Sequence, residues 1–163
     1  LKALSKEVFA WCSRLEAIEI PDNSSIHKIE KGFICLSSLE KFTIPPNVDE
    51  IKDEWCRKAK LKEVTISPKN KNFIYDGDDN QFIIGKSKNV YDILIFVKQS
   101  VKNVIIPSNI TKIYANMSLC KNLESFEFLA DELLNACDFF QDSQSVVIIS
   151  FPNLNEFQQK DTF

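Results

Sequence analysis

In Leu39-Glu40-Lys41-Phe42-Thr43-Ile44-Pro45-Pro46-Asn47, apolar residues stand at the first, fourth and sixth positions and an asparagine stands at the ninth. The alternation over Phe42-Thr43-Ile44 is typical of a short strand in which every second side chain points into a core. Pro45 has no backbone N–H, so it ends the hydrogen bonding of that strand. The asparagine follows where the chain turns, and its side chain is suited to satisfy backbone groups there. The stretch therefore predicts one short strand closed by a turn.

The same pattern returns along the whole chain. Neighbouring copies are about 22 to 24 residues apart except across one interruption, and they begin at Leu15, Leu39, Leu61, Val101, Leu123 and Val146. A second motif, apolar-x-x-apolar, follows four of the strands, at residues 26–29, 48–51, 110–113 and 154–157. One such unit cannot bury its apolar face without a neighbour, so the two matched landmarks predict a leucine-rich repeat solenoid.

Three strands end in an Ile-Pro step, at Ile20-Pro21, Ile44-Pro45 and Ile106-Pro107. Two further runs share an apolar-x-x-Cys-x-x-Leu spacing, Phe9-Ala10-Trp11-Cys12-Ser13-Arg14-Leu15 and Met117-Ser118-Leu119-Cys120-Lys121-Asn122-Leu123. With these features the chain resembles the BspA-like class of leucine-rich repeats, found in surface proteins of host-associated bacteria and in anaerobic protists. It departs from that class at Trp55 and Met117, where Phe is usual, at Ser67-Pro68, and in a sixth copy without its asparagine.

We expect an α/β fold: a right-handed, β-rich solenoid with a parallel concave sheet of about six short strands and short helices or turns on the convex side. With 163 residues, 44% of them hydrophobic, the chain is expected to form a single domain over residues 1–163. Because it opens at Leu1 inside repeat material, we expect a fragment of a longer repeat protein. A helical spacing predicts a short convex helix before the sixth strand, through Leu129, Leu133, Leu134, Cys137, Phe139 and Phe140.

Residues 67–100 form the one long interruption between copies. Turn-forming residues at 76–80 and strand-like runs at 82–84 and 93–97 predict one or two inserted β-hairpins. Asp76, Asp78 and Asn80 alternate as in a calcium loop. However, Gln81 stands where such a loop needs glycine and Ser87 stands where it needs glutamate, so a hairpin turn explains the tract better.

The pleat of the predicted strands decides which residues face outward on the concave side. The second and fourth residues after each first apolar position form two columns. The first column is Ala17, Lys41, Glu63, Asn103, Ser125 and Ile148, and the second is Glu19, Thr43, Thr65, Ile105, Glu127 and Ser150. We take these outward-facing residues as candidate contact residues. Their mixed chemistry suits a protein surface or a glycan better than a small molecule. The alternative is a solvated sheet face with no partner.

The composition gives little support for catalysis, cofactors or metals. His27 is the only histidine, and three glycines do not make a phosphate-binding loop. The five cysteines are odd in number and lack the paired spacing of a zinc site, so we interpret them as free thiols. Lysines and acidic residues are interspersed at a formal charge of −3, which indicates neither nucleic acid nor an anionic membrane as a partner. No apolar run reaches the roughly 18 residues of a spanning helix, so we expect no direct membrane insertion of this fragment.

The repeat architecture predicts a non-enzymatic binding module. The resemblance implies a cell-surface or secreted adhesion protein that engages an extracellular-matrix or host surface protein. An intracellular scaffold in the cytoplasm is the alternative, because unpaired cysteines suit a reducing compartment. Glycosylation sequons at Asn23, Asn109 and Asn116 do not decide between the two, since a chain rich in Asn, Ser and Thr contains one or two by chance.

Overall fold

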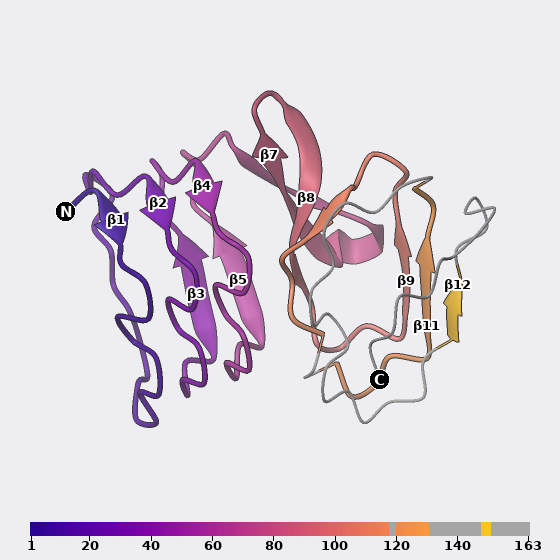
Figure 1. Cartoon of the computed structure of the whole chain (residues 1–163), viewed down its shortest axis with the longest axis horizontal. Helices are drawn as coiled ribbons and strands as arrows, with labels where there is room; N and C mark the ends of the chain where they lie inside the picture. Colours follow the sequence, from indigo (N-terminus) through magenta and orange to yellow (C-terminus); the bar gives the residue numbers. More distant parts are fainter. Residues whose placement is uncertain (118–119, 131–147, 151–163) are drawn as a thin grey trace.

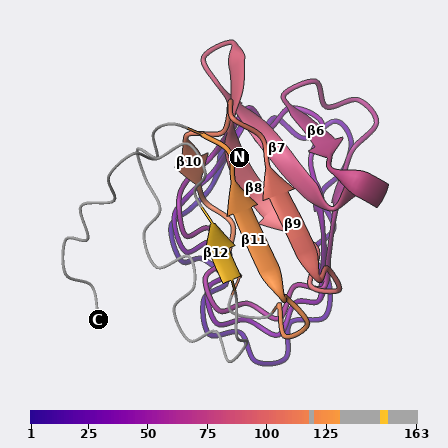
Figure 2. The same cartoon turned by 90° about the vertical axis from the view of Figure 1, so that its right-hand side faces the viewer.

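The computed structural model describes residues 1–117, 120–130 and 148–150 and shows a solenoid whose coils stack side by side (Figure 1). Four-residue strands lie on the concave side of the coils, and two-residue strands lie at the ends of coils. This architecture confirms the predicted repeat solenoid. Figure 2 views the stack from its C-terminal end, where β9, β11 and β12 lie side by side.

The concave strands pair in parallel and in repeat register. Strand β3 (Lys41–Ile44) pairs with β5 (Glu63–Ile66), and β11 (Ser125–Phe128) pairs with both β9 (Asn103–Ile106) and β12 (Ile148–Ser150). Equivalent repeat positions therefore lie opposite one another. The apolar positions of β3, β9 and β11 are buried, as the alternation predicts.

A second row of short strands comes from the apolar-x-x-apolar motif. Strands β1 (Ala3–Leu4), β2 (Lys28–Ile29) and β4 (Glu50–Ile51) form a parallel three-stranded sheet. The last residue of each motif points into the core, because a two-residue strand buries only one of its side chains.

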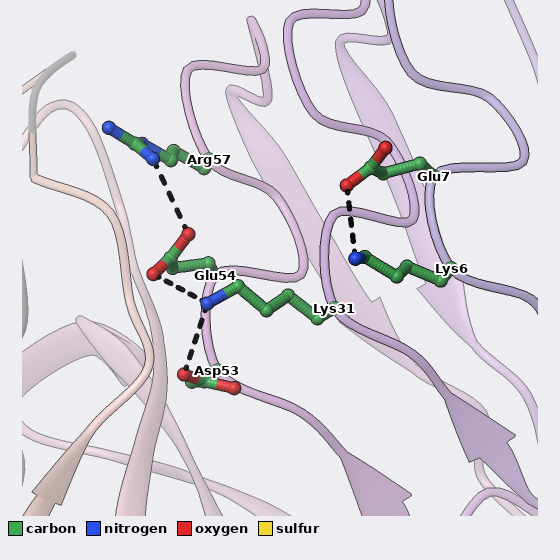
Figure 3. A network of polar contacts seen from close by, with 6 residues as sticks. All are labelled: Lys6, Glu7, Lys31, Asp53, Glu54 and Arg57. Atoms are coloured by element: carbon green, nitrogen blue, oxygen red, sulfur yellow. Dashed lines mark hydrogen bonds and ion pairs between the residues drawn. The ribbon is translucent and has the colours of Figure 1, made fainter.

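Stacked turns form the convex side of the first coils. Backbone N–H groups of one turn donate to carbonyls of the next, for example Gly32 N to Glu54 O at 3.2 Å and Leu36 N to Arg57 O at 2.9 Å. Side chains add to this ladder in Figure 3, where Lys31 Nζ lies 2.9 Å from Glu54 Oε1 and 3.7 Å from Asp53 Oδ2. Among the described residues the only helix is the short η1 (Asp78–Asn80). The helix predicted through Leu129 to Phe140 falls almost wholly outside the described residues.

The interruption folds as an antiparallel meander of three strands, which confirms the predicted hairpin insertion. Strand β6 (Phe73–Asp76) pairs with β7 (Phe82–Ser87), and β7 pairs with β8 (Val90–Val97). Strand β8 then pairs in parallel with β10 (Lys112–Ile113), so it takes the place of a second-row strand. The tip of the β7–β8 hairpin projects beyond the coils in both views (Figures 1 and 2).

One detail of the predicted sheet is wrong: the concave strands do not form one continuous sheet of about six. They form two separate sheets, β3–β5 and β9–β11–β12, with the insertion between them (Figure 1). The physical reason lies at the free edge of β5. There the Tyr75 hydroxyl accepts the Ile66 N–H at 2.9 Å, and Gln99 Nε2 donates to the Leu61 carbonyl, so side chains take the place of a neighbouring strand. No strand is assigned over residues 17–20, where the first copy was expected.

The insertion also divides the core. One buried cluster gathers the first coils and includes Ile83 and Ile95, while the other gathers the later coils and includes Ile84 and Leu94. Neighbouring residues of β7 and β8 thus face opposite clusters, because successive side chains of a strand alternate. The meander therefore lies between the two clusters and packs against one with each of its faces.

The repeat asparagines bond to the preceding coil. Asn47 Nδ2 donates to Ser24 O at 2.7 Å, and Asn109 Nδ2 donates to Tyr91 O at 2.6 Å. In the third copy Asn70, one residue later than the pattern, donates to Pro45 O at 2.7 Å and to Val48 O at 2.9 Å. This agrees with the role predicted for the asparagine.

A candidate binding face on the concave sheets

The outward residues of β3 and β5 are joined in pairs across the two strands. Lys41 Nζ lies 2.9 Å from Glu63 Oε2, and the hydroxyls of Thr43 and Thr65 lie 2.8 Å apart. The hydrogen bond to Glu63 raises the pKa of Lys41 above its ordinary value. In-register pairing places equal repeat positions opposite each other, and this is why the two columns interact within themselves.

The outward residues of β9 and β11 follow the same rule with different chemistry. Ser125 Oγ lies 2.6 Å from Asn103 Oδ1, and Ile105 stands opposite Glu127. Ile105 is 57% exposed, which is high for a large aliphatic side chain. This part of the concave side therefore joins a polar pair to an exposed apolar residue.

All ten candidate contact residues on the described strands and on the first copy are exposed or half-buried. The exposed ones are Ala17, Glu19, Lys41, Thr43, Glu63, Asn103 and Ile105, and the half-buried ones are Thr65, Ser125 and Glu127. Ile148 and Ser150 belong to β12, which pairs in register with β11. The pleat thus presents these ten side chains toward solvent.

A cleft of about 890 Å³, which we call the concave cleft, opens between residues 13–18 and strand β3. Five of the ten candidates line it, namely Ala17, Lys41, Thr43, Glu63 and Thr65. Within the described part of the chain, no backbone hydrogen bond joins residues 15–20 to β3. The cleft forms at this unpaired boundary. Glu19, Asn103, Ile105, Ser125 and Glu127 do not line it.

The structure adds lining residues that the column rule missed. They come from the turn that leads into each concave strand, and they are Ser13, Arg14, Glu16, Ser38 and Glu40. Glu40 lies 2.6 Å from Lys62, and this hydrogen bond lowers the pKa of the Glu40 carboxyl. The charged positions next to each first apolar residue were the signal that could have found them.

Other reactive groups lie apart from this face. His27 Nδ1 lies 3.7 Å from Asp49 Oδ1 on the surface. Burial raises the pKa of Cys120 to about 12 and raises that of Cys56 further, so both thiols are protonated at neutral pH. Among the described residues no group of three metal-ligating side chains occurs. The same residues include no helix long and apolar enough to cross a membrane.

Comparison with known proteins supports this architecture. The family model described as the BspA type leucine rich repeat region, in six copies, matches residues 1–77 and 80–163. The pneumococcal vaccine antigen PcpA aligns with a TM-score of 0.75 at 22% identity, over 94% of this chain and 38% of its own. A leucine rich cell surface protein from Faecalibacterium prausnitzii aligns with a TM-score of 0.62 at 22% identity, over 83% of this chain and 35% of its own. At these identities the likeness shows the fold. No curated protein sequence matches the chain.

Proposed function

The chain belongs to the BspA-type leucine-rich repeat family. On that premise we propose that it is the binding module of a cell-surface adhesion protein and that it binds a partner with its concave face. Repeat families of this kind are generally non-enzymatic binding scaffolds. The surface role is supported by the F. prausnitzii structure, which is described as a cell surface protein. The partner class is a protein of the extracellular matrix or of a host surface, or a glycan on it.

The observation that carries the proposal is the paired outward columns beside the concave cleft. Lys41, Thr43, Glu63 and Thr65 are held by their cross-strand partners before any ligand arrives. A partner then immobilises fewer free side chains, so less conformational entropy is lost on binding. The cleft supplies concave depth next to these groups.

The decisive variant replaces Lys41 and Glu63 by Ser and Thr65 by Ala in one chain. Removing both members of the ion pair leaves no unpaired charge, so the fold is expected to survive. The matched control replaces Asp22 and Lys69 by Ser, an exposed ion pair of 2.7 Å that does not line the cleft.

Binding to a panel of purified extracellular-matrix proteins and host glycans is measured by biolayer interferometry, with urea unfolding as the fold check. We expect the triple variant to lose at least about tenfold in affinity and the control to keep the parent affinity. Equal affinity of parent and triple variant for every ligand bound would contradict a role for the concave face.

An intracellular scaffold is the second candidate, and one observation favours it. The four cysteines among the described residues, Cys12, Cys35, Cys56 and Cys120, are free thiols, as suits a reducing compartment. Antibody staining of intact and permeabilised source cells separates the two. Signal on intact cells supports the surface role, whereas signal only after permeabilisation supports the scaffold.

A further inference from the structure

A second hollow lies between β4 and the β7–β8 hairpin, outside the concave cleft. Its volume is about 300 Å³, and we call it the lysine hollow. The apolar part of its lining comes from Ile51, Phe73, Ile93 and Ile95, which are buried core residues. Its polar part includes the half-buried Tyr114 and Ser87. The insertion creates this hollow by bringing β7 and β8 next to the second-row strands.

The charge of the hollow opposes that of the chain. Lys52, Lys86, Lys88 and Lys112 line it with two acidic residues, Asp49 and Glu50, so the lining carries a formal charge of +2 within a chain of −3. These lysines are far apart in the sequence, and only the tertiary fold brings them together.

Glu50 already has cationic partners, and Asp49 lies beside the His27 imidazole. Glu50 forms an ion pair with Lys52, and its carboxylate lies 3.3 Å from Lys28 Nζ. The hydrogen bond from Lys52 is the main reason that the pKa of Glu50 is lowered. Asp49 lies 3.7 Å from His27. Within the described part of the chain, neither Lys86 nor Lys88 forms an ion pair. Their ammonium groups therefore keep donors for an anion.

Two of the lysines are held in place. Lys112 Nζ lies 3.0 Å from both Asp92 Oδ2 and Ser87 Oγ. Lys86 Nζ donates to the Lys71 carbonyl at 3.0 Å and lies 4.7 Å from the centre of the Tyr91 ring. Donors fixed in this way lose little side-chain entropy when a ligand binds, which favours a defined site over a diffuse charged surface.

We propose that the lysine hollow binds one carboxylate- or sulfate-bearing sugar ring of an anionic glycan. The ammonium groups of Lys86 and Lys88 suit the anionic substituent, and the Tyr114 hydroxyl suits a sugar hydroxyl. The volume, at the small end of ligand pockets, fits one ring rather than a folded peptide surface. This site is separate from the concave cleft and does not depend on the function proposed for it.

The test uses the full chain labelled with ¹⁵N and titrated with three tetrasaccharides. These are hyaluronan, with carboxylates only, chondroitin sulfate, with carboxylates and sulfates, and chitotetraose, which is neutral. We expect the two anionic ligands, but not chitotetraose, to shift the amides of Ser87, Lys88 and Tyr114. The Lys86→Gln, Lys88→Gln double variant should bind about tenfold more weakly, because two charge-assisted contacts are lost.

A matched control changes the same charge elsewhere, with Lys60→Gln and Lys121→Gln, two exposed lysines outside the hollow. This control and the concave triple variant should both keep the parent affinity. The proposal is overturned if neither anionic tetrasaccharide shifts these amides, or if chitotetraose shifts them equally. An equal loss in the control, or a hexaglutamate peptide that shifts them when the sugars do not, also overturns it.

Discussion

At the scale of single residues, the two tryptophans show how position decides the contribution of a side chain. Trp55 is fully buried, and its Nε1 donates to the Ile95 carbonyl at 3.2 Å across to the insertion. Trp11 is 74% exposed on a convex turn. The same residue type therefore joins the coil to the insertion at one site and lies in solvent at the other.

Replacing Trp55 with Phe should lower the free energy of unfolding by about 2–3 kcal/mol. The change leaves the buried Ile95 carbonyl without its donor and also removes ring volume from the core. Trp11→Phe is the matched control and should stay within about 0.5 kcal/mol of the parent. Urea unfolding followed by circular dichroism measures both, and equal stabilities of the two variants would contradict the role of Trp55.

Asp92 is the second residue whose environment sets a measurable property. Burial alone would raise its pKa, but hydrogen bonds from Ser87 and Lys112 outweigh burial and hold the pKa below its ordinary value of 3.8. A carboxyl with a lowered folded-state pKa stabilises the fold above its unfolded pKa. That stabilisation is lost as pH falls through the folded pKa.

Asp92→Asn should therefore lower the free energy of unfolding by about 1–2 kcal/mol at pH 7, because Lys112 loses its partly buried partner. The difference between parent and variant should stay constant from pH 7 to about 5 and shrink below pH 3.8. Thermal unfolding at a series of pH values tests this. A difference that grows on acidification would show that Asp92 does not act as a stabilising anion.

At the scale of elements, residues in the left-handed backbone conformation, with positive φ, recur in the turns. In the convex turns they stand at Glu7, Gly32 and Glu54 and again four residues later at Trp11, Leu36 and Lys58. Only one of these six is glycine, so most of these turns keep a side chain in a conformation that glycine adopts more easily. The stacked backbone hydrogen bonds of the turns hold it there.

The β7–β8 hairpin offers the clearest test of this backbone strain. Its two-residue turn is Lys88-Asn89, and only Lys88 has a positive φ, of 58°. Lys88→Gly should raise the free energy of unfolding by about 0.5–1 kcal/mol, since glycine is favoured where the first turn residue has a positive φ. Asn89→Gly is the control and should give no gain, because that position has no such strain. Urea midpoints compare the two, and a larger gain from Asn89→Gly would refute the assignment.

At the scale of the whole molecule, the insertion packs against both core clusters, so we expect the two clusters to unfold together. Leu94 faces the second cluster and Ile95 faces the first, and both are buried. A repeat array without such an insertion is held together only by contacts between neighbouring coils. Here strand β8 contributes buried side chains to both core clusters.

Leu94→Ala should destabilise both clusters together, by about 2–5 kcal/mol. Native-state hydrogen exchange should show the same loss of protection for amides of β5, in the first part, and β11, in the second. Ile105→Ala, at an exposed concave position, should leave both unchanged. Loss of protection confined to β11 would mean that the clusters unfold independently.

The candidate site was accessible from the sequence in part. The pleat identified the outward residues of the strands, and Lys41, Thr43, Glu63 and Thr65 lie together as in-register pairing requires. The lining residues Arg14 and Glu40 were missed because they precede the strands, where no alternation indicates a direction.

By itself, the sequence determined the repeat register, the inward positions such as Phe42 and Ile44, the role of the repeat asparagines and the place of the insertion. Each of these depends on local periodicity and on contact with the next coil. The same residue pattern for both recurs in every copy of the repeat, so the sequence shows it. Only the tertiary structure decided that the concave sheet is split, that residues 17–20 leave a cleft, and that four distant lysines share one hollow. The split sheet and the lysine hollow depend on how β6 to β8 pack, and the cleft depends on the missing pairing between residues 15–20 and β3. Contacts such as Trp55 to Ile95 join residues 40 positions apart that no repeat period relates.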